Sequence, residues 1–287
     1  MARNGVQSKS YRLMEWQLKI PKIFHVYWGG GPMSYLRFMT IKSFMKYNPD
    51  WEIRYYHPTT HSIHKTWVTN EQKYDVTLCD DYTPELMKLP ITKFQVDFQI
   101  YNFNNDMPEV HKSDFLRLEL LSTIGGLWSD MDIIYFKSMN SLYFNCLKYS
   151  HIETFYCDHN YGHSIGFLMS SPENKFFAKL KEIAIQEYSP LNYQSLGCVI
   201  YNKYFKSGES IEALTASHNI SMDVVYAHDA GHIEDIVNTN QPKFTEESIG
   251  IHWYGGSPIW KNFIITTNGG LNNLPDNIIG NLLKSES

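Results

Sequence analysis

Two aspartates, Asp130 and Asp132, stand in the middle of an apolar run, LWSDMDIIYF, that covers Leu127–Phe136. The run is typical of a β-strand, in which side chains two positions apart point to the same face. Two carboxylates held close together repel each other unless a cation lies between them. Their oxygens suit Mg²⁺ or Mn²⁺, which also bind phosphate oxygens. The pair is therefore a candidate metal site; the alternative is a strand end that carries two solvated acids.

A second pair of charges lies just before this run, in the segment HKSDFLRLELLSTIGG. The segment is apolar on most sides and predicts a largely buried helix over Pro108–Ile124, stopped by Gly125 and Gly126. Asp114 and Arg117 are three positions apart and share a helix face. Because buried charges are rare unless paired or functional, the two residues either form an internal salt bridge or hold a polar ligand such as a sugar.

The elements that must position these residues begin with a strand over Ile20–Trp28, rich in β-branched and aromatic residues. The turn Gly29-Gly30-Gly31-Pro32, a helix over residues 34–47 and a strand over Trp51–Tyr56 follow. Strand, glycine-rich turn, helix and strand open a nucleotide-binding α/β unit. The later elements that we expect are two strands and a helix, at Thr154–Cys157, Ser164–Ser170 and Pro172–Tyr188.

Composition limits the function classes. The chain has 287 residues, of which 43% are hydrophobic, and this suits one domain over residues 20–287 behind a mildly basic extension at 1–19. A formal net charge of −5 argues against nucleic-acid binding. No apolar stretch is long enough to span a membrane, and residues 1–19 lack the apolar core of a signal peptide. That extension is either a solvated helix or a contact to a membrane surface. The four cysteines contain no C-x-x-C pair, so we expect reduced thiols rather than a zinc site.

The motif H-K-S-D-x-x-R, followed by a helix and then by G-G-x-W-x-D-x-D, resembles the DXD region of glycosyltransferase family 32. It is also similar to the glucosyltransferase domains of the large clostridial toxins, and the family includes the yeast initiating mannosyltransferases. The resemblance implies that Asp114 and Arg117 contact the donor sugar, and that Asp130 and Asp132 bind Mn²⁺ or Mg²⁺.

Two further blocks support this resemblance. In IFHVYWGGGP, residues His25, Trp28, Gly30 and Gly31 match the family's opening strand, whose Trp stacks on the nucleotide base. The alternative for Trp28 is a core aromatic. In GIHWYGGSPIW, over Gly250–Trp260, His252 is similar to a C-terminal His of the family and is expected to join the metal shell. The glycines and Pro258 of this segment suggest a lid over the donor, with Trp260 covering the site. The alternative for His252 is a structural histidine in an aromatic cluster.

The resemblance implies a GT-A fold, which is a Rossmann-like α/β architecture with a twisted, mostly parallel sheet flanked by helices. It implies transfer of a hexose or pentose from a nucleotide-sugar donor, most often a UDP-sugar, to a glycan or glycoconjugate acceptor, with retention at the anomeric carbon. Golgi members of the family carry a membrane anchor that this sequence lacks. This favours a cytoplasmic enzyme of bacterial or viral type over one in the secretory lumen, or else a form from which an anchor was removed.

Two other function classes also use paired acids or a sugar clamp. A metal-dependent phosphohydrolase or nucleotidyltransferase would need a second carboxylate cluster for a second metal, and the sequence offers no convincing one. A non-catalytic sugar-binding protein on a decayed transferase fold would be expected to have lost some of Asp114, Arg117, Asp130 and Asp132, and all four are present.

Overall fold

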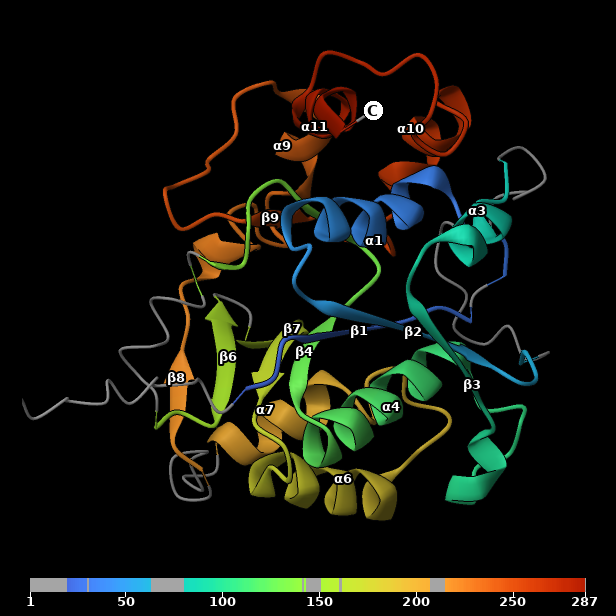
Figure 1. Cartoon of the computed structure of the whole chain (residues 1–287), viewed down its shortest axis with the longest axis vertical. Coiled ribbons are helices and arrows are strands. Elements are labelled where there is room, and N and C mark those ends of the chain that lie inside the picture. Colours follow the sequence, from blue (N-terminus) through green and yellow to red (C-terminus); the bar gives the residue numbers. More distant parts are fainter. Residues whose placement is uncertain are drawn as a thin grey trace, which may run out of the picture.

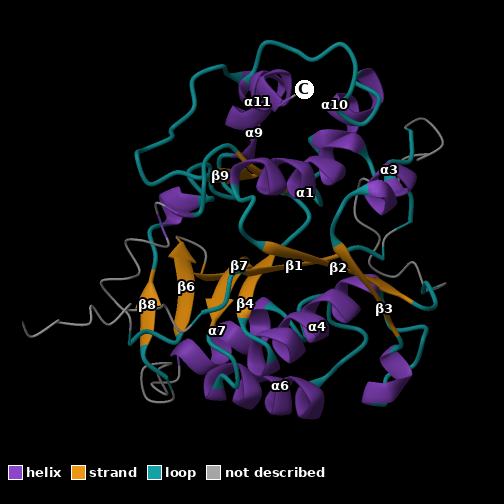
Figure 2. Ribbon diagram, in the orientation of Figure 1, coloured by secondary structure: helices purple, strands orange, loops and turns teal. Residues whose placement is uncertain are grey.

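The structure of the protein is a computed structural model, which describes residues 20–29, 31–62, 80–140, 142, 151–159, 162–206 and 215–286. The central element is a seven-stranded sheet with the order β3-β2-β1-β4-β7-β6-β8 (Figures 1 and 2). Neighbouring strands are parallel except β7, which runs antiparallel to both β4 and β6. The strands are β1 Ile23–Tyr27, β2 Glu52–Pro58, β3 Thr92–Val96, β4 Gly126–Ser129, β6 Thr154–His159, β7 Gly162–Ser170 and β8 Ser217–Asn219.

Helices cover both faces of this sheet (Figure 2). On one face lie α4, α6 and α7, and on the other lie α1, α9, α10 and α11 (Figure 1). Their bounds, with that of α3, are α1 Tyr35–Tyr47, α3 Thr83–Lys88, α4 Glu109–Thr123, α6 Lys175–Glu187, α7 Cys198–Lys206, α9 Ile233–Asn238, α10 Trp260–Thr266 and α11 Ile278–Glu286. None of the helices in the described ranges is both long and apolar enough to cross a bilayer.

The strands alternate their side chains between two hydrophobic cores. Phe24 and Val26 of β1 pack in the core that contains α1, whereas Tyr27 packs in the core that contains α4. Leu127 and Trp128 of β4 divide in the same way. This period of two is what a sheet covered on both faces requires.

The predicted opening unit is confirmed, since β1, α1 and β2 form a parallel β-α-β unit and α4 leads into β4. Ser34 caps α1 by accepting from the backbone N–H of Arg37, and Gly125 and Gly126 end the α4 connection with positive φ angles of 73° and 106°. The mostly parallel α/β architecture is therefore as expected. Residues 1–19 lie outside the described ranges, so the extension and its membrane-surface contact stay predictions.

The single strand expected over Leu127–Phe136 is wrong. The segment is divided into β4, a turn over residues 130–132, and a short β5, Ile133–Tyr135. β5 leaves the large sheet and pairs antiparallel with β9, Gly250–His252. The backbone N–H of Asp130 still donates to the carbonyl of Gly166 in β7, while the carbonyl of Asp132 accepts from Trp253. The two aspartates therefore lie where the chain passes from one sheet to the other.

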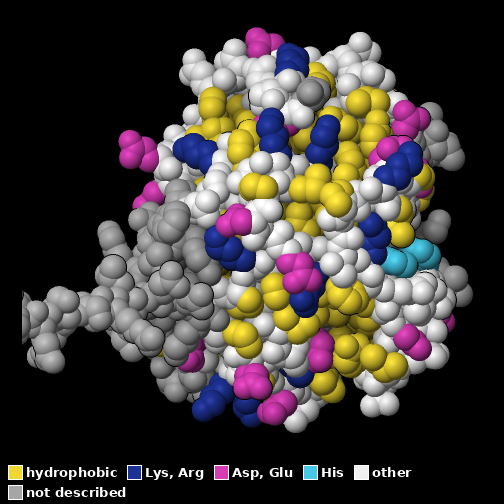
Figure 3. Space-filling view, in the orientation of Figure 1, with side chains coloured by type: hydrophobic (Ala, Val, Ile, Leu, Met, Phe, Trp, Pro, Cys, Tyr) yellow, Lys and Arg dark blue, Asp and Glu magenta, His cyan; other side chains and the backbone are white. Residues whose placement is uncertain are grey.

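Charges on the visible face are mixed. In the orientation of Figure 3, basic and acidic side chains are interspersed and do not form a continuous basic surface. Together with the net charge of −5, this face offers no continuous basic surface of the kind that binds a nucleic acid.

Candidate active site

A cavity of about 630 Å³ opens where β1 and β4 end. The chain leaves β1 toward β2 on one side, and β4 lies on the other side, so this is the point at which the strand order reverses. Ligands of open α/β sheets bind at such a point, beyond the carboxyl ends of the strands. The residues predicted as site residues and found in its wall are Trp28, Asp114, Arg117, Asp130, Asp132 and His252.

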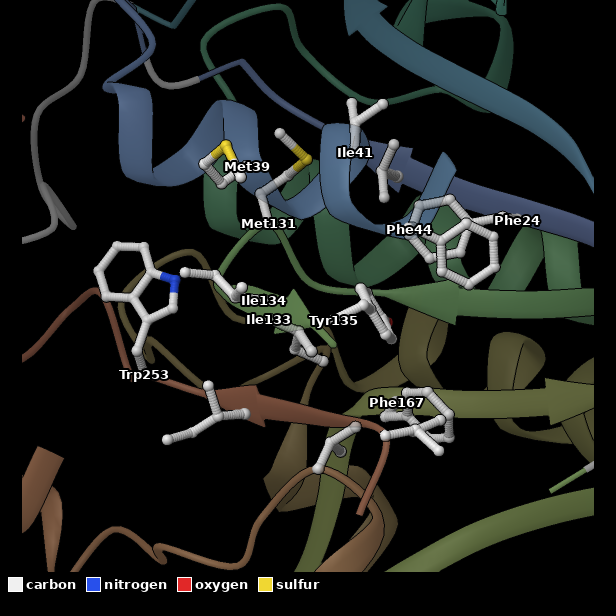
Figure 4. Packing of buried hydrophobic residues seen from close by; sticks show 14 of the residues in the cluster. Phe24, Met39, Ile41, Phe44, Met131, Ile133, Ile134, Tyr135, Phe167 and Trp253 are labelled. Atoms are coloured by element: carbon white, nitrogen blue, oxygen red, sulfur yellow. The ribbon is translucent and has the colours of Figure 1, made fainter. Parts of the chain in front are cut away.

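The turn over residues 130–132 directs both aspartates to the cavity because Met131, between them, is an apolar anchor. Met131 is 3% exposed and belongs to the core cluster that also contains Met39 of α1 (Figure 4). The buried methionine fixes the turn against the core, and both flanking carboxylates lie in the cavity wall.

Strand pairing brings His252 to these aspartates. Ile133, which follows Asp132, pairs with His252 in the β5–β9 register. One possible ligand atom from each of Asp130, Asp132 and His252 lies within 4.8 Å of the others. The structure thus brings together the three residues that the sequence proposed as metal ligands.

The Asp132 carboxylate has the properties of a metal ligand. Its Oδ1 is buried, receives no hydrogen bond of good geometry from the described residues, and lies 3.0 Å from Nε2 of His252. Its Oδ2 accepts from the N–H of Gly255 at 2.9 Å. Burial alone would raise the pKa of Asp132, but His252, Arg37 and the Gly255 N–H hold it below its usual range. An ionised, buried carboxylate beside a second carboxylate and an imidazole fits Mn²⁺ or Mg²⁺.

Asp114 and Arg117 of α4 form a buried pair that reaches the metal-ligand group. Arg117 donates to Oδ1 of Asp114 at 2.6 Å and to the carbonyl of Ile165 at 2.7 Å, and its guanidinium lies 3.6 Å from Oδ1 of Asp130. Burial raises the pKa of Asp114 to about 7, although Arg117 opposes this shift. The pair is therefore both a salt bridge and part of the cavity wall.

Trp28 lies at the end of β1 and lines the cavity with a half-buried ring. Its Nε1 donates to the carbonyl of Gly31, whose φ of 95° is one that glycine adopts readily. Gly30 lies outside the described residues. The closest packing is at Gly29, where an added Cβ would lie 2.0 Å from Oε2 of Glu109. A side chain at position 29 would therefore displace the wall of the cavity.

His25 matches the resemblance but does not reach the cavity. It is fully buried, contacts the hydroxyl of Tyr56 at 3.0 Å and the carbonyl of Gly125 at 2.8 Å, and burial lowers its pKa to about 4. This neutral histidine ties β1 to β2 and to the loop before β4, so its role is structural.

The segment Gly250–Trp260 is only partly a cover for the cavity. Its first residues form β9 within the core, and Trp260 is fully buried against Trp253 with ring centroids 5.0 Å apart. Tyr254 and Ser257 do line the cavity. The expected cover by Trp260 is therefore wrong, because that ring is a core residue.

Sequence reasoning missed two charged residues of the wall, Glu109 and Arg37. Glu109 accepts from the Tyr27 hydroxyl at 2.5 Å, from the N–H of Ser62 at 2.7 Å and from the fully buried Lys112 at 2.9 Å. This network fixes the ends of β1 and α4 against each other. The signal in the sequence is the lysine of H-K-S-D, because a lysine on a largely buried helix needs an acidic partner.

We expect Trp28→Ala to weaken nucleotide binding by about 1–3 kcal/mol, the usual value for stacking of a base on an aromatic ring. The loss should be equal for a nucleoside diphosphate and for the full nucleotide sugar, since the ring is proposed to contact only the base. Titration calorimetry with UDP and UDP-glucose measures both. If Trp28 only fills the core, the melting temperature falls while both affinities stay unchanged.

The comparisons with known proteins agree with this geometry. Residues 37–147 match the family model of the glycosyltransferase sugar-binding region containing DXD motif. The match spans less than half of the chain, and it includes α4, both aspartates and β5. Among curated proteins, none matches the chain significantly.

Several solved glycosyltransferases resemble the structure at low sequence identity. The glycosyltransferase GlyE of Streptococcus pneumoniae has 12% identity and a TM-score of 0.52, over 93% of this chain and 64% of that one. The galactosyltransferase LgtC, solved with donor and acceptor sugar analogs, has 12% identity and a TM-score of 0.48, over 88% of this chain and 96% of that one. The UDP-bound glycosyltransferase domain of the YGT toxin has 12% identity and a TM-score of 0.43, over 70% of this chain and 79% of that one. The likeness to GlyE shows the fold, which is GT-A, as the sequence predicted.

Proposed function

We propose that this protein is a metal-dependent glycosyltransferase that moves a sugar from a nucleotide-sugar donor, a UDP-sugar, to a glycan or glycoconjugate acceptor. The observation that carries the proposal is the meeting of two groups in one cavity at the switch point of the sheet. One group is Asp130, Asp132 and His252, which are arranged to hold Mn²⁺ or Mg²⁺, and the other is the buried pair of Asp114 and Arg117.

Each group has a separate task in the proposed reaction. Asp130, Asp132 and His252 would hold a divalent cation, which would stabilise negative charge on the leaving diphosphate. Trp28 stacks on the base, while Asp114 accepts from sugar hydroxyls and Arg117 donates to sugar oxygens, so that the anomeric carbon is oriented before reaction. The bond from the anomeric carbon to the phosphate oxygen breaks, the bond to the acceptor oxygen forms, and the acceptor proton passes to the leaving phosphate.

Retention is part of the proposal, and the neighbours of the acidic side chains support it. Of the carboxylates that the structure describes in the cavity wall, Asp130 and Asp132 belong to the metal-ligand group, Asp114 pairs with Arg117, and Glu109 accepts three hydrogen bonds. None is left over as the general base that an inverting transfer needs, or as the nucleophile of a double displacement. A route in which acceptor and leaving group share one face of the sugar needs no such residue.

The alternative of a two-metal phosphohydrolase has less support. Within the described part of the chain, Asp130, Asp132 and His252 are the one group of three side chains close enough to hold a metal ion. A two-metal enzyme needs a second group about 3.5–4 Å away.

A panel of donors tests the proposal. UDP-glucose, UDP-galactose, UDP-N-acetylglucosamine and GDP-mannose are each added with and without Mn²⁺, and the melting temperature and the release of free nucleotide diphosphate are measured. We expect one donor to raise the melting temperature only with Mn²⁺, because a ligand of the folded state stabilises it. We also expect slow Mn²⁺-dependent hydrolysis at the anomeric carbon. Cleavage within the diphosphate would indicate a phosphohydrolase, and binding without any cleavage a sugar-binding protein.

A further inference from the structure

Arg37, in the first turn of α1, has surroundings that are unusual for a charged side chain. It is 5% exposed and lies between two indole rings, with its guanidinium carbon 4.8 Å from the ring centroid of Trp28 and 4.8 Å from that of Trp253. Its NH1 lies 3.8 Å from Oδ2 of Asp132. One side chain therefore contacts the proposed base platform, the core and a proposed metal ligand.

The neighbouring backbone leaves room for this arrangement. At Gly255, an added Cβ would lie 2.2 Å from NH2 of Arg37 and 2.8 Å from its guanidinium carbon. The N–H of the same glycine donates to Oδ2 of Asp132, which is the oxygen that faces Arg37. A planar guanidinium fits between two rings where a lysine ammonium would not, so the pocket selects arginine.

The charges around the cavity give Arg37 an effect on cation binding. Lys112 lies 2.9 Å from Glu109 and Arg117 lies 2.6 Å from Asp114, so these two acids are paired. Arg117 also lies 3.6 Å from Asp130, and Arg37 lies 3.8 Å from Asp132, so Arg37 is the cation that offsets the charge of Asp132. In a buried site with weak screening, this offset reduces the attraction for a free divalent cation. A bound diphosphate adds negative charge to the site and so restores the attraction for the cation.

We propose that Arg37 is a positioning residue with two opposite effects, and the inference rests on the proposed function above. It holds the ring of Trp28 in place for the base, which strengthens nucleotide binding. It also offsets the charge of Asp132, which weakens binding of the free cation. The metal-ligand group is therefore filled when nucleotide is present and stays largely empty when only the cation is available.

Two substitutions separate these effects. Arg37→Gln removes the charge, and we expect Mn²⁺ alone to bind about tenfold more tightly. We expect UDP alone to bind about tenfold more weakly, because the Trp28 ring loses the guanidinium that packs against it. Arg37→Lys keeps the positive charge but loses the planar guanidinium group. We expect it to weaken UDP similarly and to leave the affinity for Mn²⁺ alone unchanged. Mn²⁺ binding is measured by electron paramagnetic resonance of the free ion and UDP binding by calorimetry.

A purely structural role for Arg37 predicts that both variants bind both ligands more weakly, and equal or weaker Mn²⁺ binding by Arg37→Gln would overturn the proposal. If the wild-type protein binds no UDP even with Mn²⁺, the proposed function fails and this inference fails with it. If Arg37→Gln does not fold, Gly255→Ala gives a second test, since its methyl group would overlap the guanidinium and so displace it from its position beside Asp132. It should tighten Mn²⁺ binding, whereas the matched control Gly256→Ala, whose methyl group meets no atom within 4 Å, should not.

Discussion

Asp132→Asn is expected to abolish Mn²⁺-dependent nucleotide binding and to lower donor hydrolysis or sugar transfer by about 10²–10³-fold, the usual loss when one contact to transition-state charge is removed. Asn keeps the shape of Asp and can still accept from the N–H of Gly255, so the turn should remain. It lacks the negative charge by which Asp132 attracts a divalent cation. Hydrolysis of the donor identified by the panel, with and without a chelator, measures the effect.

The same variant should also be less stable at neutral pH. The two neighbouring acids alone suggest that removing a charge relieves repulsion, but the structure argues the opposite. The pKa of Asp132 is lowered in the fold by His252, Arg37 and Gly255, so the ionised form stabilises the folded state above the unfolded pKa of about 4. Asp276→Asn, at an exposed position outside the cavity wall, is the control for activity and should leave Mn²⁺-dependent hydrolysis unchanged. Unchanged activity of Asp132→Asn in the presence of chelator would refute the metal site.

Arg117→Ala is expected to reduce affinity for the intact nucleotide sugar at least about tenfold more than affinity for the bare nucleotide diphosphate, because Arg117 is proposed to contact the sugar. Its removal leaves Asp114 buried without its partner, which typically costs about 3–5 kcal/mol of stability. The raised pKa of Asp114, about 7, allows protonation to offset part of that loss. Calorimetry with both ligands and chemical denaturation measure the two effects.

Asp114→Asn and the double variant complete a mutant cycle for this pair. If Asp114 and Arg117 act together on the sugar, the losses in donor affinity will be strongly non-additive, as for groups in direct contact. Equal losses for donor and bare diphosphate in Arg117→Ala would mean that the pair is only a salt bridge inside α4.

The sequence predicted the elements whose ends carry strong local signals. Glycines mark the end of β1 and the end of α4, so both were placed to within a few residues. The division of Leu127–Phe136 could not be predicted, because Ile133–Tyr135 is as apolar as a continuation of β4 would be. What divides it is pairing with β9, more than 100 residues later, and no local pattern reports a partner at that distance. The carboxylates reach the same cavity through the turn and not through strand alternation.

Arg37 escaped prediction for a related reason. A single arginine near the start of a helix is usually solvent-exposed, and only the folded chain places Trp253 and Asp132 around it. Asp114 and Arg117 were found because several apolar neighbours in one helix marked them as buried. A buried charge can therefore be predicted from the sequence only when the residues that bury it are its neighbours along the chain.

The pairing of β5 with β9 has a consequence for how the protein is made. The first two proposed ligands are synthesised before the midpoint of the chain, but the third comes with Gly250–His252. A nascent chain still on the ribosome has both aspartates long before it has the histidine that completes the group. In the proposed metal site, a translation product that ends before Gly250 therefore lacks both the histidine ligand and the strand that pairs with β5.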